Sequence, residues 1–275
     1  MDPIDTNEPE QEVTGAETVE PGEGELSHSD KMIGVFSEPA KMFDLTSKFP
    51  PRHKDWVIPI IILMVLVGIT RTISMMNEEV FLEAKQKQIA GIEKMVENGT
   101  LTQEQGDQAI NRIDQQMEFM RGPVGWVINI VSTLIFGTLF FIIIAGIYFL
   151  FIKFLLKGEG TFASTLVASG LVGYISIIQV IIAAMLTMAM GKIFEDTSVA
   201  AFIGADKSTL IGWLYGKLDP ISIWAYIVLS IGLAKMFKSK STGKYYALVF
   251  GLWLVGTLLF FFVAKAVPFL GFLNR

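Results

Sequence analysis

The chain has 275 residues, of which 52% are hydrophobic, and its mean hydropathy is +0.51. This composition excludes an ordinary soluble globular domain, and the absence of cysteine excludes disulfides, thiol catalysis and thiolate metal ligands within these residues. The net charge of −5 conceals an asymmetry: residues 1–30 carry ten acidic side chains and no Lys or Arg, which leaves 22 basic against 17 acidic side chains in the rest of the chain.

The first 55 residues divide into two parts. Residues 1–30 are rich in Glu, Pro, Gly and Thr, so we expect a disordered acidic tail, either simply solvated or docking a basic partner. Residues 31–55 place apolar side chains at helical spacing beside a basic edge, with a helix starting at about Ser37. This segment lies either in the headgroup plane or against the protein's own cytoplasmic face. The apolar positions are Met32, Val35, Phe36, Pro39, Met42 and Phe43.

Long uncharged runs predict an all-α polytopic membrane protein with five transmembrane helices. Residues 122–152 alone form a run of 31 without a formal charge, and about 20 apolar residues in helix cross a hydrocarbon core of about 30 Å. The spans are expected at about 56–75, 123–152, 162–190, 221–237 and 245–267, within a membrane domain of residues 56–275. Asp55, followed by Pro59 in the first turn, is the expected N-cap of the first span, and Asp219 that of the fourth.

Residues 77–121 are polar with apolar stripes and predict a helical hairpin outside the membrane, between spans one and two. Asn98-Gly99 is typical of a helix C-terminus, and Thr102 with Gln105 forms a capping box for the second helix. Residues 210–218, which include Trp213 and Tyr215, indicate an interfacial segment before the fourth span.

The density of Lys and Arg favours a cytoplasmic N-terminus, with the hairpin and the C-terminus outside. The strongest indication is the linker of residues 235–244, which carries four lysines directly beside the bilayer. We expect these lysines, together with two phenylalanines of the amphipathic segment, to contact the membrane surface or a partner. The candidate contact residues are Lys235, Lys238, Lys240, Lys244, Phe36 and Phe43.

No pattern predicts a catalytic residue, a cofactor or a metal site. His28 and His53 lie in the tail and just before the first span, so neither can form a Ser–His dyad in the bilayer. In the third span, Gly170 and Gly173 are candidates for close helix packing, and Gln179 for an interhelical hydrogen bond or a substrate contact. A transport path would need polar groups such as Asn129, Gln179 and Arg71 to line it.

Several phrases resemble the Yip1 domain family, in the bacterial form that carries a polar hairpin after the first span. They are VFSEPAKMF at 35–43, DWVIP at 55–59 and LDPISIWAYIVLSIGLAKMFKSKSTGKYYAL at 218–248, and the resemblance covers about residues 31–272. It implies five spans and a cytosolic N-terminus. Eukaryotic relatives are implicated in vesicle traffic and bind Rab-type GTPases, whereas the long hairpin favours a bacterial inner membrane. The family defines no catalytic residue.

We therefore expect a non-enzymatic membrane scaffold or adaptor, with the lipid bilayer and a protein at the cytoplasmic face as partners and no nucleic acid. The alternative is a small transporter or a transporter accessory subunit.

Overall fold

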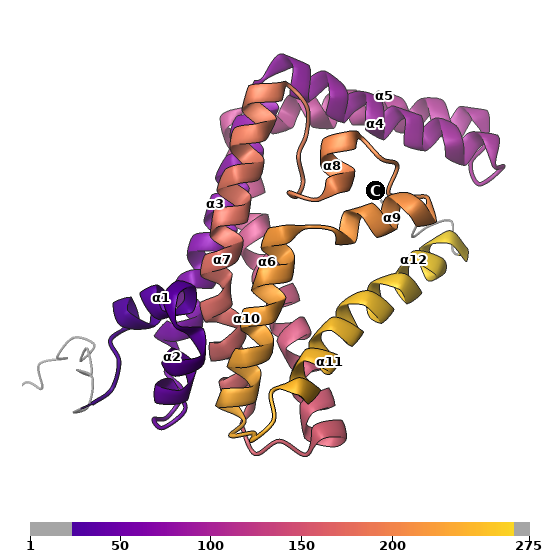
Figure 1. The fold of residues 1–275 in the computed structure, drawn as a ribbon. Coiled ribbons are helices and arrows are strands. Elements are labelled where there is room, and N and C mark those ends of the chain that lie inside the picture. The colour runs from indigo at the N-terminus through magenta and orange to yellow at the C-terminus, as the bar shows by residue number, and fades with distance from the viewer. Residues whose placement is uncertain (1–23, 267–275) are drawn as a thin grey trace, which may run out of the picture.

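The computed structural model describes residues 24–266, and this part of the chain is helical without a strand (Figure 1). In chain order the helices are α1 (His28–Ser37), α2 (Pro39–Thr46), α3 (Lys54–Met76), α4 (Glu78–Glu97), α5 (Gln103–Met120), α6 (Pro123–Phe151), the π-helix η1 (Ile152–Leu156), α7 (Phe162–Met190), α8 (Val199–Ile203), α9 (Leu210–Lys217), α10 (Pro220–Met236), α11 (Gly243–Gly251), the π-helix η2 (Leu252–Gly256) and α12 (Thr257–Ala266).

Four helical segments among the described residues are long and apolar enough to cross a membrane: Lys54–Met76, Pro123–Leu156, Phe162–Met190 and Gly243–Lys265. Helices α9 and α10 are long and apolar enough to cross a membrane only if they are taken together. They are bent by 62° at the break between Lys217 and Pro220. The predicted all-α polytopic fold is confirmed. The count of five spans holds if this bent pair is one broken span.

The bundle is built around α7, which packs on α3 and α6 and, on another side, on α10 (Figure 1). Close approach to α3 depends on Gly170, because a Cβ there would collide with the backbone of Trp56. Leu171, Ile175 and Leu233 are fully buried where α7 and α10 meet. Small residues thus bring the helices together, and branched side chains fill the spaces between them.

Helices α4 and α5 form the predicted antiparallel hairpin, which lies across the upper end of α3 in Figure 1. The capping box is present, since Thr102 accepts from the Gln105 backbone N–H and Gln105 accepts from the Thr102 N–H. Gly99 takes a left-handed φ of +70° in the turn. A small apolar cluster that includes Phe81 and Met117 joins the two helices. We call this the hairpin end of the bundle.

Two local expectations need correction, and a third is confirmed. Order begins by residue 24 rather than after residue 30, because Ser27 caps α1 in a capping box with Asp30; residues 1–23 lie outside the described residues. His53, not Asp55, occupies the N-cap of α3, so Pro59 falls in the second turn. Asp219 does cap α10, since its Oδ1 accepts from the backbone N–H groups of Ile221 and Ser222.

Candidate functional site

The N-terminal cap, by which we mean residues 24–27 with α1 and α2, is docked on the bundle at the end opposite the hairpin (Figure 1). Helix α1 packs on α7 and α3, and α2 packs on α10. Val35 and Phe43 are fully buried in this contact. Gly232 of α10 makes room for Phe43, because a Cβ there would lie 2.8 Å from the Phe43 ring atom Cζ. The cap is therefore part of the protein's own core.

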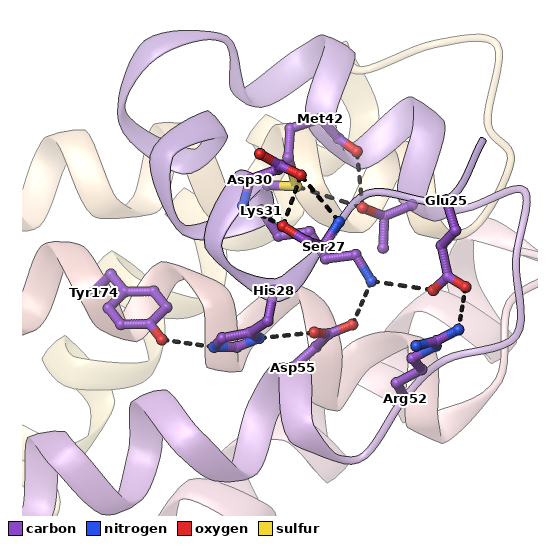
Figure 2. A network of polar contacts seen from close by, with 10 residues as sticks. Glu25, Ser27, His28, Asp30, Lys31, Met42, Arg52, Asp55 and Tyr174 are labelled. Carbon is purple, nitrogen blue, oxygen red and sulfur yellow. Dashed lines mark hydrogen bonds and ion pairs between the residues drawn. The ribbon is translucent and has the colours of Figure 1, made fainter. Parts of the chain in front are cut away.

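A buried cluster of polar side chains fastens α1 to the bundle (Figure 2). Lys31 Nζ lies 2.6 Å from Asp55 Oδ2 and 3.5 Å from Glu25 Oε1, and Arg52 forms an ion pair with Glu25. The side chains of Lys31, Glu25 and Asp55 are at most 3% exposed. Burying such charges is costly unless each finds a partner of opposite sign, which each one does here.

His28 extends the cluster into the third span. Its Nδ1 lies 2.8 Å from Asp55 Oδ1 and its Nε2 lies 2.7 Å from the hydroxyl of Tyr174 on α7 (Figure 2). An ionised carboxylate only accepts hydrogen bonds, so Nδ1 donates to Asp55. We call Glu25, His28, Lys31, Arg52, Asp55 and Tyr174 the Asp55 cluster. It joins the cap, the start of α3 and the middle of α7.

The cluster is the feature that the sequence interpretation missed. His28 and Glu25 fall within the residues expected to form a disordered tail, and Asp55 is the expected N-cap of the first span. The pattern Ser27-His28-Ser29-Asp30, a Ser followed three residues later by an acid before an apolar stripe, is a helix-start signal that could have placed α1.

The lysine linker, residues 235–244, runs from the last turn of α10 to the first turn of α11, at the same end of the bundle as the cap (Figure 1). Lys235 Nζ lies 3.0 Å from Asp44 Oδ1 and so connects the linker to α2. Lys238, Lys240 and Lys244 are exposed, and within residues 24–266 they form no ion pair or hydrogen bond through their side chains. These three lysines are available to a ligand outside the chain.

The two candidate phenylalanines differ. Phe36 is partly buried with its ring 5.8 Å from that of Trp224, whereas Phe43 is fully buried against α10. The predicted contact of Phe43 with the membrane surface is therefore wrong, because the apolar face of α2 is already covered by the bundle. Of the two placements that the amphipathic pattern left open, packing on the protein is the one that this residue adopts.

The candidate packing residues of α7 lie at helix contacts. Gly170 faces Trp56, and a Cβ on Gly173 would lie 3.4 Å from Ile60. Gln179 Nε2 donates to Asp219 Oδ2 at 2.6 Å and to Ser222 Oγ at 3.0 Å, which links α7 to α10. In the described part of the chain, no group of three or more His, Asp or Glu side chains is arranged to hold a metal ion.

Comparison with known proteins gives one finding. A family model described as the Yip1 domain matches residues 33–264, which run from within α1 to α12 and include the lysine linker, whereas Glu25, His28 and Lys31 of the Asp55 cluster precede the matched range. No curated protein and no solved structure matches the chain.

Proposed function

The chain belongs to the Yip1 domain family, and on this premise we propose that it is a non-enzymatic integral membrane scaffold or adaptor that engages proteins or lipids at its cytoplasmic face. We place it in the cytoplasmic membrane of a bacterium, with the cap and the lysine linker inside and the hairpin outside. The clustering of lysines on the cap end supports this orientation, since cytoplasmic loops carry the excess of Lys and Arg.

The observation that carries the proposal is the position of three unpaired lysines beside a docked cap. Lys238, Lys240 and Lys244 lie within seven residues of one another, next to an α2 that Phe43 and the Lys235–Asp44 ion pair fix in place. A group of like charges at one end of the bundle suits an adaptor, because it attracts an anionic ligand to that surface. Near an anionic leaflet each lysine contributes about 1 kcal/mol.

The test uses the full chain in native membranes and the variant Lys240→Glu/Lys244→Glu. The matched control is Lys94→Glu/Arg112→Glu, which reverses two exposed charges on the hairpin. Cross-linking in membranes followed by mass spectrometry counts bound proteins, and lipid analysis of the purified chain counts anionic lipid.

We expect the linker variant to lose at least two thirds of one of these ligands and the control to keep it. Equal thermal unfolding of parent and variants would show that folding is intact. If the linker variant kept every protein and lipid that the parent binds, the adaptor proposal would be refuted.

Transport has weaker support. Gln179 lines a cavity between the spanning helices, but neither Asn129 nor Arg71 does. Its amide nitrogen is also committed to Asp219 and Ser222. The three polar residues therefore do not form one path.

A further inference from the structure

A half-open cavity of about 250 Å³ lies between four spanning helices, α3, α6, α7 and α10. On α7 it is lined by residues from Ser169 to Gln179, at intervals of three or four that keep them on one helix face. Ten residues of helix rise about 15 Å, so the cavity is a slot along the bundle axis. Residues of α3, α6 and α10 complete the lining.

The walls of the slot differ in polarity. Six side chains contribute hydroxyl or amide groups: Tyr148, Ser169, Ser176, Gln179, Ser222 and Tyr226. Residues of α3 and of the second half of α6 form an apolar part of the lining, with Leu63, Met64, Phe141 and Ile144. A molecule that fits both walls must itself have a polar and an apolar side.

Most of these hydroxyls lack a partner within the chain. Tyr148, Ser169, Ser176 and Tyr226 form no hydrogen bond through their hydroxyls with any described residue, and Ser169 Oγ is fully buried. A buried hydroxyl without a partner costs roughly 1–3 kcal/mol, and inside a bilayer no bulk water is present to compensate. Ser169 Oγ is such a group, and together with the three other unpartnered hydroxyls that line the slot it indicates a hydrogen-bonding molecule from outside the chain.

The occupant should be neutral, because no Asp, Glu, Lys, Arg or His lines the slot. The nearest acid in the hydrogen-bond network, Asp219, is already saturated. Its carboxylate accepts from Gln179 Nε2, from the hydroxyl and backbone N–H of Thr197, and from two backbone N–H groups of its own helix turn. These five donors occupy the Asp219 carboxylate, and no other charged group reaches the slot to bind an ion.

We propose that this slot binds the glycerol and ester region of a neutral membrane lipid of the diacylglycerol class. The ester and hydroxyl oxygens pair with the unpartnered hydroxyls of α6, α7 and α10, and the start of an acyl chain lies along the apolar wall. The volume corresponds to about eight water molecules at about 30 Å³ each. It therefore holds this part of the lipid, while the remaining chains stay in the bilayer between α6 and α10.

The test reconstitutes the full chain in nanodiscs that contain dioleoylglycerol or a photoactivatable diacylglycerol. The variant Ser176→Ala/Tyr226→Phe removes two unpartnered hydroxyls, and Ala225→Leu fills the slot. Tyr215→Phe, on α9 and away from the slot, is the matched control. We expect cross-linking to peptides of α7 and α10 in the parent and the control, and at least a tenfold loss in both slot variants.

A second readout separates binding from damage to the fold. Without diacylglycerol, Ser176→Ala/Tyr226→Phe should unfold at the same temperature as the parent or higher, because it removes unpaired polar groups from apolar surroundings. Only the parent and the control should then gain stability when dioleoylglycerol is added. Equal cross-linking in all four proteins, or a parent that neither cross-links nor gains stability, as for a slot that holds water only, would overturn the proposal.

Discussion

Replacing Lys31 by methionine should release the N-terminal cap from the bundle. Methionine keeps much of the length of the lysine stem, so the change removes a charge without opening a large cavity. It leaves Asp55, which is wholly buried, with His28 as its remaining side-chain donor. Removing one partner of a buried ion pair costs about 3–5 kcal/mol. At 1.4 kcal/mol per tenfold, cap opening should rise by between two and nearly four orders of magnitude.

The assay exploits the absence of cysteine from the chain. Val35 is wholly buried on the face of α1 that packs on the bundle, so the thiol of Val35→Cys reacts only when the cap separates from the bundle. Ala40→Cys lies on the exposed side of α2 and reports the intrinsic reactivity of a thiol there. We expect Lys31→Met to accelerate labelling of the Val35→Cys thiol at least a hundredfold and to leave labelling of the Ala40→Cys thiol unchanged.

A second substitution tests whether the loss comes from the stranded carboxylate. Adding Asp55→Asn to Lys31→Met removes the unpaired charge, so the double variant should recover at least about 1 kcal/mol relative to the sum of the single losses. An unchanged labelling rate in Lys31→Met would refute a fastening role for the Asp55 cluster. Strictly additive losses would show that Lys31 and Asp55 do not share one interaction.

Three further outcomes are expected. Phe43→Ala should lower the free energy of α2 docking by about 3–5 kcal/mol, measured by labelling of a thiol at the buried position Met42→Cys of α2, because a wholly buried ring leaves a cavity against α10. In intact cells an impermeant thiol reagent should label Gly99→Cys on the hairpin and not Ser241→Cys in the lysine linker; the reverse pattern would show the opposite orientation. Burial alone would raise the pKa of Asp196, but the hydrogen bond and charge of Lys207 hold it below its ordinary value. A carboxyl of this kind stabilises the fold above its unfolded pKa of about 4, and the contribution is lost as pH falls through the lower folded pKa. Hydrogen-exchange protection of the Asp196 loop should therefore fall below about pH 4, and Asp196→Asn should abolish that dependence.

The spans and the hairpin could be predicted because their causes are local. An uncharged run such as residues 122–152 has one stable form in a bilayer, since a helix satisfies its own backbone groups. The turn between α4 and α5 is set by Gly99 and by Thr102 with Gln105, which act within a few residues of one another. The bend between α9 and α10 is harder to predict from the sequence, because residues 210–218 are apolar enough either to lie at the membrane interface or to begin a span.

The polar contacts that fasten the cap could not be predicted, because the residues that form them are distant in sequence. Glu25 is buried by Arg52 and Lys31, and His28 reaches Tyr174 on another helix. From composition alone, Glu25 cannot be told apart from the other acidic residues of a solvated tail. The positive end of the helix dipole stabilises an Asp in the first turn whether the Asp caps the turn or pairs with a cation, so the sequence indicates the commoner role, the N-cap.

The two helices of the cap are held by contacts of different strength. Helix α1 is fastened by buried charges, whose separation is costly because each would be left unpaired. Helix α2 is held by Phe43 and by the Lys235–Asp44 pair, whose side chains are 35% and 48% exposed. An ion pair with that exposure contributes about 0–1 kcal/mol and weakens as salt rises. An anionic ligand at the lysine linker can therefore compete for Lys235 at little cost. We expect such a ligand to loosen the charged edge of α2 while the Asp55 cluster keeps α1 in place.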